Sequence, residues 1–468
     1  MVFSSLEFIY FYLPLCLFLY FIIPAKHLAI RNAVLFVVSL AFYGWSEPIY
    51  ILIMLFSTLL DYTCGYLVSK NKEIAPKKAK VALITSVVVN LSILFFFKYF
   101  DFLIETISTI PLFSGLKPIG IALPVGISFY TFQTMSYTID IYMGNARMQK
   151  NVLSFGSYVT MFPQLIAGPI VRYKDIDEAL RQRNHSFERA SRGCKRFICG
   201  LAKKVLLANT AGVMYEQMVQ NTYSSPNALA SWSGIIFYAF QIYFDFSGYS
   251  DMAIGLGYIL GFDFPENFNY PYISRSVTEF WRRWHITLST WFREYVYIPL
   301  GGNRKGRGRT YFNLFAVWFL TGLWHGASWN FVLWGLYFCV LLIFEKAFLL
   351  RLFEKIPKVF SHIYLILAVL LGWMLFISCD LSDPIGYLTS MFTAPAFTGI
   401  SFYDFARSAV LLIILAFAST PIPNLIYQKI KDNKIIQIIW CILLPIVLLV
   451  CTAYLVDSSY NPFLYFRF

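Results

Sequence analysis

The sequence predicts an all-α, polytopic integral membrane protein, and three observations support this fold class. Of the 468 residues, 58% are hydrophobic and only 13% are charged, whereas soluble domains carry about 25% charged residues. The mean hydropathy is strongly positive, at +0.61. Apolar runs that approach the length of a transmembrane helix, about 20 residues, recur along the whole chain. A water-soluble protein is therefore excluded.

The apolar runs predict about 10–12 transmembrane helices, together with re-entrant and interfacial helices. The first run has no basic start and no small-residue cleavage site after it. We therefore expect it to stay as a span and not to act as a signal peptide. The expected spans cover residues 6–23, 33–45, 48–68, 81–97, 119–142, 197–218, 231–260, 314–345, 359–378, 407–426 and 435–456.

The net charge of +13 is explained by membrane topology. Two polar segments, 220–231 and 379–406, contain no Lys or Arg. By the positive-inside rule these segments are external and the basic clusters are cytoplasmic. Because topology accounts for the basic balance, we expect no nucleic-acid partner. The basic clusters lie at residues 70–80, 147–150, 172–204, 275–309, 346–358 and 429–434.

Two apolar regions begin and end among basic residues, so each is expected to enter and leave the membrane on the same side. Val152–Val171 is interrupted by proline and glycine, which predicts a re-entrant segment. Asn313–Lys346 is too long for one ordinary helix and short for two. We therefore expect a hairpin of short helices with Gly322–Trp329 at its turn, and this hairpin would place His325 inside the membrane.

The segment 262–310 is both aromatic and basic, which predicts a helix lying at the cytoplasmic membrane interface. His285 lies four residues after Trp281 and shares its face, whereas the arginines lie off that face. Such an amphipathic helix would present its arginines to lipid head groups or to ligand phosphates. The apolar side chains that recur at helical spacing on this face are Trp281, Trp284, Leu288, Trp291, Phe292 and Tyr295.

Among the five histidines, His325 has the most unusual surroundings, because it lies in TGLWHGASWNF, a glycine-rich break inside an apolar region. An ionisable group at this depth is costly, yet a neutral imidazole can accept a proton from a hydroxyl nucleophile. A buried histidine can equally bridge two helices by hydrogen bonds, and composition leaves both interpretations open. His285 suits a structural or positioning role. The remaining histidines lie in polar stretches typical of a solvated surface: His27, His185 and His362.

No other motif predicts a catalytic or metal site. The loop GGNRKGRGR lacks the Lys-Ser or Lys-Thr ending of a P-loop, and a cytoplasmic positive-inside loop is favoured over a phosphate-binding loop. Ser328 has no evident third partner for a triad. The eight cysteines are scattered without metal-ligand spacing, so we expect no metal. The acidic candidates form no evident acid–base pair: Asp140, Asp245, Asp251, Glu266 and Glu279.

Several long motifs resemble the membrane-bound O-acyltransferase family, and in particular its bacterial alginate O-acetylation branch. The resemblance covers nearly the whole chain, from MVFSSLEFIYFYLP through LPVGISFYTFQTMSYTIDIY, FPQLIAGPIVRY and QIYFDFSGYSDMAIGLG to NPFLYFRF. It is densest in ENFNYPYISRSVTEFWRRWHITLSTWFREYVYIPLGGNRKG and GLWHGASWNFVLWG. It implies one membrane domain over residues 1–468, with N-terminal helices in 1–145, a catalytic core in 146–345 and C-terminal helices in 346–468.

The resemblance also implies catalytic roles for His325, in the GLWHG motif, and His285, in the WRRWH motif. His325, at the bottom of a membrane funnel, would accept the proton of an acceptor hydroxyl as this hydroxyl attacks an acyl thioester. The donor would be cytoplasmic acetyl-CoA or another acyl thioester, used as a co-substrate without a bound cofactor. The residues expected to bind or position the donor are Trp281, Arg282, Arg283, Trp284, Asn303, Arg304, Lys305, Trp324 and Trp329.

The same branch implies a multi-pass protein of the bacterial cytoplasmic (inner) membrane with an extracytoplasmic SGNH-type acetyltransferase partner, which would pass the acyl group to a polysaccharide. The longest external stretch, 379–406, is too short to bind a polymer, which favours such a relay. Two alternatives stay open. One is D-alanyl transfer to teichoic acid from a carrier protein, the activity of a sister member of the family, and the other is a transporter of lipid-linked sugars.

Overall fold

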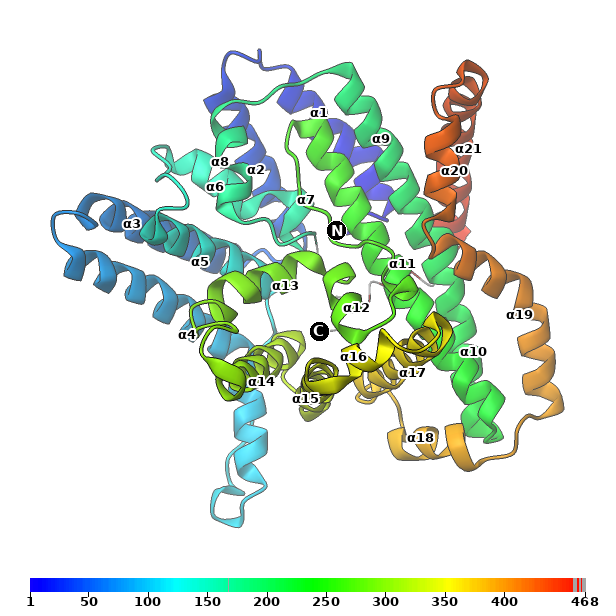
Figure 1. Cartoon of the computed structure of the whole chain (residues 1–468). Coiled ribbons are helices and arrows are strands. Elements are labelled where there is room, and N and C mark those ends of the chain that lie inside the picture. Colours follow the sequence, from blue (N-terminus) through cyan, green and yellow to red (C-terminus); the bar gives the residue numbers. More distant parts are fainter. Residues whose placement is uncertain (167, 458–460, 463, 465–468) are drawn as a thin grey trace. The chain divides into compact units, whose positions relative to one another are not determined.

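The computed structural model describes residues 1–166, 168–457, 461–462 and 464, and every regular element in this part of the chain is a helix (Figure 1). This confirms the predicted all-helical membrane protein. Most of the NPFLYFRF motif lies outside the described residues. Eight described helices are long and apolar enough to cross a bilayer: Leu28–Ser46, Ile51–Asn71, Pro76–Ser108, Phe187–Ser224, Trp329–Phe353, Lys358–Ile377, Gly399–Ala418 and Lys434–Asp457.

In two of the predicted spans a helix begins or ends well inside the predicted range. The span expected at 119–142 is helical only from Ile127, because Gly126 adopts a left-handed conformation with φ 75° and breaks the chain direction. The span expected at 407–426 ends at Ala418. Pro421 follows closely, and proline disfavours helical backbone in the residue before it.

The described chain forms two compact units. The first comprises residues 1–197 and 249–266, and the second comprises residues 198–248 and 267–468. Helices α9 (Phe187–Ala202) and α11 (Ala228–Leu260) contribute residues to both units. The expectation of a single membrane domain stays a prediction.

The first unit is organised around α3, α4 and α5, which pack against one another, and around α2, which packs mainly against α6. Aromatic side chains near the N-terminus add to its core, where the ring of Phe8 lies 5.9 Å from that of Phe42 and 6.1 Å from that of Phe162. The elements of this unit besides α9 and α11 are η1 (Phe8–Tyr12), α1 (Leu13–Phe21), α2 (Leu28–Ser46), α3 (Ile51–Asn71), α4 (Pro76–Ser108), η2 (Pro111–Phe113), α5 (Ile127–Met143), α6 (Val152–Thr160), α7 (Phe162–Leu165) and α8 (Tyr173–Arg181).

A fully buried carboxylate, Asp61, joins three of these helices. It lies on α3 and accepts hydrogen bonds from Ser86 and Asn90 on α4 and from Thr138 on α5. Burial of a carboxylate is tolerated when polar donors surround it. The hydrogen bonds of Asp61 therefore link three helices, and we assign this carboxylate no catalytic role.

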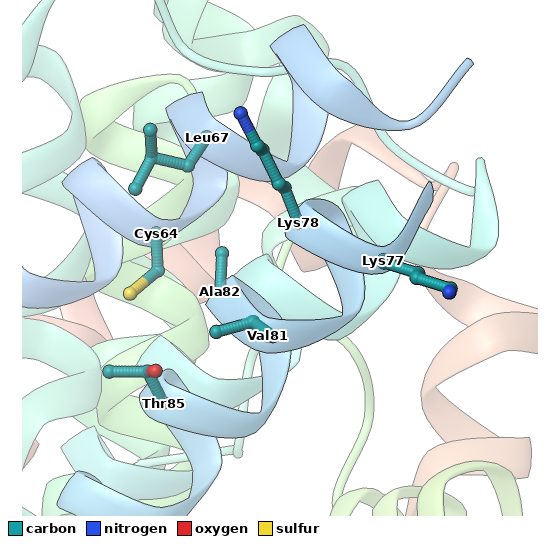
Figure 2. A pocket seen from close by; sticks show the side chains of 7 residues that line it. All are labelled: Cys64, Leu67, Lys77, Lys78, Val81, Ala82 and Thr85. Carbon is teal, nitrogen blue, oxygen red and sulfur yellow. The ribbon is translucent and has the colours of Figure 1, made fainter. Parts of the chain in front are cut away.

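A groove of about 320 Å³ lies between α3 and α4 and is shown in Figure 2. Lys77 and Lys78 lie near one end of the groove and Thr85 near the other, with mainly apolar side chains between them. The residues that line it include none of the predicted catalytic or donor-binding residues.

The predicted re-entrant segment is broken as expected. Its first part is α6, which Asn151 caps by accepting hydrogen bonds from the backbone N–H groups of Leu153 and Ser154. At Met161 the backbone leaves the helical region with ψ 110°, and the short α7 follows. Residue 167 of this segment lies outside the described residues.

The second unit contains the hairpin of α14 and α15, which pack closely side by side, and α17 packs against α15 (Figure 1). Its elements besides α9 and α11 are η3 (Lys203–Ala208), α10 (Asn209–Ser224), η4 (Pro271–Ile273), α12 (Val277–Arg283), α13 (Ile286–Phe292), η5 (Arg293–Tyr297), α14 (Gly306–His325), α15 (Trp329–Phe344), η6 (Glu345–Leu349), α16 (Leu350–Phe353), α17 (Lys358–Ile377), α18 (Pro384–Thr393), α19 (Gly399–Ala418), α20 (Ile422–Ile430) and α21 (Lys434–Asp457).

Glycine allows α14 and α15 to approach each other closely. A Cβ atom on Gly335 would lie 2.4 Å from the carbonyl oxygen of Trp318, and one on Gly322 would lie 2.5 Å from that of Phe331. The predicted hairpin is therefore present, but its second helix is not short, because Trp329–Phe353 is long and apolar enough to cross a bilayer. Its turn is shorter than expected and consists of residues 326–328, because Gly322 lies inside α14.

The prediction of a single interfacial helix around the WRRWH motif is wrong in one respect. The segment forms two short helices, α12 and α13, separated by a break at His285, whose φ of 41° is left-handed. The predicted burial pattern still holds, because Trp281, Trp284 and Trp291 are buried and Arg282 is exposed. The apolar pattern predicted which side chains are buried but not the path of the backbone.

Candidate active site

His325 is the last residue of α14, at the tip of the α14–α15 hairpin. The helix ends there because Gly326 takes an extended conformation, with φ −173° and ψ 158°. The side chain of His325 is only 6% exposed. The hairpin thus holds an imidazole in a buried position between two helices.

Aromatic side chains surround the imidazole of His325. Its ring centroid lies 5.1 Å from that of Trp324, 4.9 Å from that of Trp334 on α15, and 5.3 Å from that of Phe376 on α17. All three contacts are close to edge-on, an arrangement that aromatic rings favour. The packing fixes the orientation of the ring and keeps water from most of it.

His285 is the second buried histidine, at 1% exposed, and lies at the break between α12 and α13. Asn267 stabilises this break. Its backbone carbonyl accepts a hydrogen bond from the N–H of Ile286, at 3.0 Å. Its side-chain Oδ1 accepts from the backbone N–H of Thr287 at 3.3 Å and from the hydroxyl of the same residue at 2.9 Å. One residue therefore holds the start of α13 in place.

The same Oδ1 atom lies 3.0 Å from Nδ1 of His285. The backbone N–H of Thr287 can only donate, so the Asn267 atom that faces it must be the oxygen and not the amide nitrogen. Nδ1 of His285 must then carry the proton that it donates to this oxygen. In the neutral imidazole, Nε2 is left as a hydrogen-bond acceptor.

The rings of both histidines contact the same tryptophan, Trp324. The ring of Trp324 is 5.8 Å from that of His285 and 5.1 Å from that of His325. Burial, and to a smaller extent the charge that His325 carries when protonated, lower the pKa of His285 well below its ordinary value. His285 is therefore neutral at physiological pH, and the two imidazoles are electrostatically coupled.

A buried glutamate, Glu345, anchors the start of α12, the end of this helix that lies away from the break at His285. Its carboxylate accepts hydrogen bonds from the backbone N–H of Val277 at 2.6 Å, from that of Thr278 at 2.8 Å and from the Thr278 hydroxyl at 2.6 Å. These groups begin α12 and have no intrahelical acceptor of their own. Glu345 therefore fixes the helix that leads to His285.

The predicted donor-binding tryptophans differ in their positions. Trp281 packs edge-on against Trp318 and Trp334, at 4.9 and 5.5 Å, and so belongs to the aromatic surroundings of His325. Trp284 packs against other rings and is buried. Trp329, in contrast, is 57% exposed at the start of α15.

The predicted basic residues lie outside the buried site. Arg282 is exposed, and Arg283 is ion-paired with Glu279 at 2.9 Å. The loop before α14 exposes its polar side chains, namely Asn303, Arg304 and Lys305. The structure therefore places Trp324 against both histidines and Trp281 against Trp334, which itself contacts His325. It does not bring these basic side chains into the aromatic packing.

Sequence reasoning missed four residues of the site: Asn267, Trp334, Glu345 and Phe376. A buried amide such as Asn267 has no periodic signal, because its contacts are with residues 18 to 20 positions away. Trp334 and Phe376 follow the apolar pattern of their helices and resemble any core residue. In the described part of the chain, no group of three or more His, Cys, Asp or Glu side chains is placed to hold a metal ion.

The acidic candidates outside this site have structural partners. Asp245 is ion-paired with Lys204 at 2.8 Å, and both side chains are buried. In the first unit, Arg196 pairs with Asp251 at 2.8 Å and with Glu266 at 2.5 Å. These ion pairs hold helices together. Because each of the three carboxylates is already paired with a cation, none is well suited to act as a base.

The eight long apolar helices define an integral membrane protein, and comparison with known families specifies its class. The profile of MBOAT, the membrane-bound O-acyltransferase family, matches residues 146–381, a segment that contains both histidines. The chain belongs to the membrane-bound O-acyltransferase family. It is thus an acyltransferase of bacterial membranes, as predicted from the motifs.

Individual relatives specify the type of acyltransferase. The chain is 37% identical to the "Probable alginate O-acetylase" of Pseudomonas putida over 100% of both chains. It is 31% identical to the peptidoglycan O-acetyltransferase of Helicobacter pylori, over 100% of this chain and 98% of the relative. It is 30% identical to the teichoic acid D-alanyltransferase of Bacillus subtilis, over only 47% of this chain and 60% of the relative. The predicted alginate O-acetylase type is confirmed.

Proposed function

We propose that this protein takes an acetyl group from cytoplasmic acetyl-CoA and moves it across the membrane for O-acetylation of an extracytoplasmic polysaccharide. The observation that carries the proposal is the placement of His285 and His325 on one buried tryptophan, Trp324. A buried site lets a neutral imidazole act as a base and protects a thioester from hydrolysis. Full-length similarity to two O-acetylating enzymes supports acetyl transfer to a glycan.

In the proposed reaction, His325 is the general base. It accepts the proton of the attacking hydroxyl while the hydroxyl oxygen bonds to the carbonyl carbon of the thioester. The C–S bond then breaks, the acetyl ester is released, and the proton passes to the leaving thiolate. Proton removal by a positioned base typically accelerates such a step by about 100-fold to 10,000-fold.

His285 has a positioning role in this scheme. Because Asn267 holds the proton on Nδ1, the Nε2 atom of His285 can only accept a hydrogen bond. It can receive one from the attacking hydroxyl or from the imidazolium that forms on His325, and thereby orient one of them. The depressed pKa of His285 keeps this nitrogen unprotonated.

The exposed basic residues are the proposed contacts for the phosphates of the donor. Arg282, Arg304 and Lys305 have exposed side chains, and guanidinium groups bind phosphate in a bidentate manner. Arg283 is less suited, because its guanidinium is already paired with Glu279. We therefore place the donor's phosphates on the loop before α14 rather than on Arg283.

A relay to a partner completes the proposal. The predicted external segment 379–406 contains the ten-residue helix α18 and the beginning of α19, and we infer that it is too small to bind a polymer. An extracytoplasmic SGNH-type acetyltransferase would receive the acetyl group and pass it to the polysaccharide. Co-purification of the chain with such a protein, dependent on the external segment, tests the relay separately from the chemistry.

The chemistry is tested with purified protein in lipid vesicles and radiolabelled acetyl-CoA. We expect His325→Ala to lower the rate of thioester consumption by about 100-fold or more, whereas His27→Ala, at an exposed histidine, leaves it unchanged. Retention of most of the activity by a folded His325→Ala protein would contradict the assignment of the base.

The donor is tested in the same vesicles by offering a D-alanyl carrier-protein thioester in place of acetyl-CoA. Similarity to a teichoic acid D-alanyltransferase covers 47% of the chain, which makes D-alanyl transfer the second candidate. Consumption of the D-alanyl thioester alone would favour it. Movement of a lipid-linked sugar without any thioester consumption would instead favour the transporter alternative.

A further inference from the structure

Three basic side chains lie close together in the first unit, and their hydrogen-bond partners among the described residues include no carboxylate. Arg31 lies on α2, and Arg183 and His185 lie in the connection between α8 and α9. The side chains of Arg31 and Arg183 are only 5% and 9% exposed. A buried charge is costly unless it is paired, so the partners of these two guanidinium groups decide what the cluster can do.

The partners of Arg31 are neutral. Its Nε and Nη2 atoms donate to the backbone carbonyl of Ile23, at 2.9 and 2.7 Å, and its Nη1 lies 3.3 Å from Nδ1 of His185. The guanidinium also lies over the ring of Tyr20, 5.1 Å from its centroid. None of these groups carries a negative charge.

The partners of Arg183 are also neutral. Its Nη2 donates to Oδ1 of Asn32, and its guanidinium lies 4.4 Å from the ring centroid of Phe262. Its other two donors, Nε and Nη1, are buried and have no hydrogen-bond acceptor among the described residues. A buried donor without an acceptor is rare and costly, and it commonly marks a position that an ion or ligand completes.

The pKa of the neighbouring His185 responds to the positive charges of Arg31 and Arg183. Because Arg31 donates to Nδ1 of His185, the proton of this imidazole lies on Nε2, which is 3.2 Å from the carbonyl oxygen of Leu260. Burial, followed by the charges of Arg31 and Arg183, lowers the pKa of His185 to about 4. A positive potential thus persists at the cluster.

The surroundings of the cluster fit a membrane surface. Its loop belongs to the basic segment 172–204, which the charge pattern assigns to the cytoplasmic side. Large apolar side chains are exposed close by along the chain, including Phe187 at 96%. The others are Phe21, Ile22 and Ile30. Apolar groups next to cations are typical of protein surfaces that bind anionic lipid.

We propose that Arg31 and Arg183 form a binding site for a phosphate group, carried by an anionic phospholipid head group or by free phosphate. Phosphate oxygens would accept hydrogen bonds from the remaining donors of Arg183 and would neutralise the positive charges of Arg31 and Arg183. The planar guanidinium matches phosphate geometry. His185 is only half-buried, so the cluster is not wholly enclosed.

The test measures the melting temperature of the full-length protein in phosphatidylcholine nanodiscs, alone, with added phosphatidylglycerol, or with added inorganic phosphate. A ligand that binds only the folded state raises its stability. We expect phosphatidylglycerol to raise the melting temperature of the wild-type protein. We expect Arg183→Gln and Arg31→Gln to weaken the apparent affinity by about tenfold, the effect of losing one charge-assisted hydrogen bond.

Arg181→Gln is the matched control, because Arg181 is nearby in sequence but is already ion-paired with Asp177 at 2.9 Å. It should keep the wild-type response. An equal response to inorganic phosphate alone identifies free phosphate as the source, whereas a response to phosphatidylglycerol alone identifies the lipid. Absence of any response in the wild-type protein overturns the proposal, whether or not the variants fold. An unchanged response in both arginine variants overturns it as well.

Discussion

Oδ1 of Asn267 lies 3.0 Å from Nδ1 of His285 and thereby determines which ring nitrogen carries the proton. The same oxygen accepts hydrogen bonds from the backbone N–H and the hydroxyl of Thr287. These two bonds identify the atom as the amide oxygen and therefore as an acceptor. A residue 18 positions earlier in the chain thus sets the chemistry of a histidine at a helix break.

Asn267→Ala is expected to lower kcat for acetyl transfer by about 100-fold, the effect of misplacing a catalytic group by about 1 Å. Without the acceptor, the imidazole can adopt either tautomer, and the start of α13 loses the two hydrogen bonds that Thr287 donates to the Asn267 side chain. The KM for acetyl-CoA should change much less, because the exposed loop proposed to bind the donor is not involved. Steady-state kinetics in vesicles measure both constants.

Asn267→Asp is the control variant. It should shift the pH–rate profile, which would not shift if Asn267 had a purely structural role. The carboxylate still accepts from Nδ1, but its negative charge raises the pKa of His285. The neutral form is then populated only at higher pH, so the acidic limb of the pH–rate profile should shift to higher pH. An unchanged profile with equal loss of kcat in both variants would show that Asn267 acts only on folding.

Acid stability should also depend on His285. Its pKa is lowered in the folded state, whereas the unfolded chain binds this proton below about pH 6.5. The unfolded state therefore binds more protons, and stability falls as the pH decreases through this value. We expect His285→Gln to flatten the fall in melting temperature on acidification, and His27→Gln, at an exposed site, to leave it unchanged.

The sequence predicts side-chain burial better than backbone direction. Trp281, Trp284 and Trp291 were expected on one apolar face, and all three are buried although the helix breaks between them. Burial follows from hydrophobicity, which each residue carries locally. The break at His285 depends on Asn267, and a long-range hydrogen bond leaves no periodic trace in the sequence.

The hairpin around His325 is the part of the site that could be predicted most fully. Glycine, serine and histidine interrupt an apolar run that is too long for one helix, and this conflict has few structural solutions. The aromatic surroundings could not be predicted, because Trp334 approaches His325 from the second helix of the hairpin and Phe376 approaches it from α17. Their spacing along those helices is that of ordinary core residues.

Gly335→Ala is expected to destabilise the hairpin that carries His325. The new Cβ would lie 2.4 Å from the carbonyl oxygen of Trp318, a backbone atom that can move only if α14 and α15 separate. Overpacking of this kind costs about 1–3 kcal/mol. Gly308→Ala, in the same helix as Trp318 but with no atom within 4 Å of its Cβ, should be neutral or slightly stabilising. Thermal unfolding and activity of the two variants check the prediction.

Glu345→Gln is expected to weaken the anchor of α12 and so to disturb His285 at its far end. The carboxylate accepts three hydrogen bonds from Val277 and Thr278, and the glutamine amide would place a donor against at least one of these donors. Loss of a charged acceptor in a buried position costs about 1.5–3 kcal/mol.

The measurement for Glu345→Gln is the melting temperature together with kcat. Glu354→Gln serves as the control, because it removes the same charge from an exposed position a few residues further along the chain. We expect Glu345→Gln alone to lower both quantities. If both variants behaved like the wild-type protein, the start of α12 would not depend on Glu345, and the position of His285 would have to be maintained by Asn267 alone.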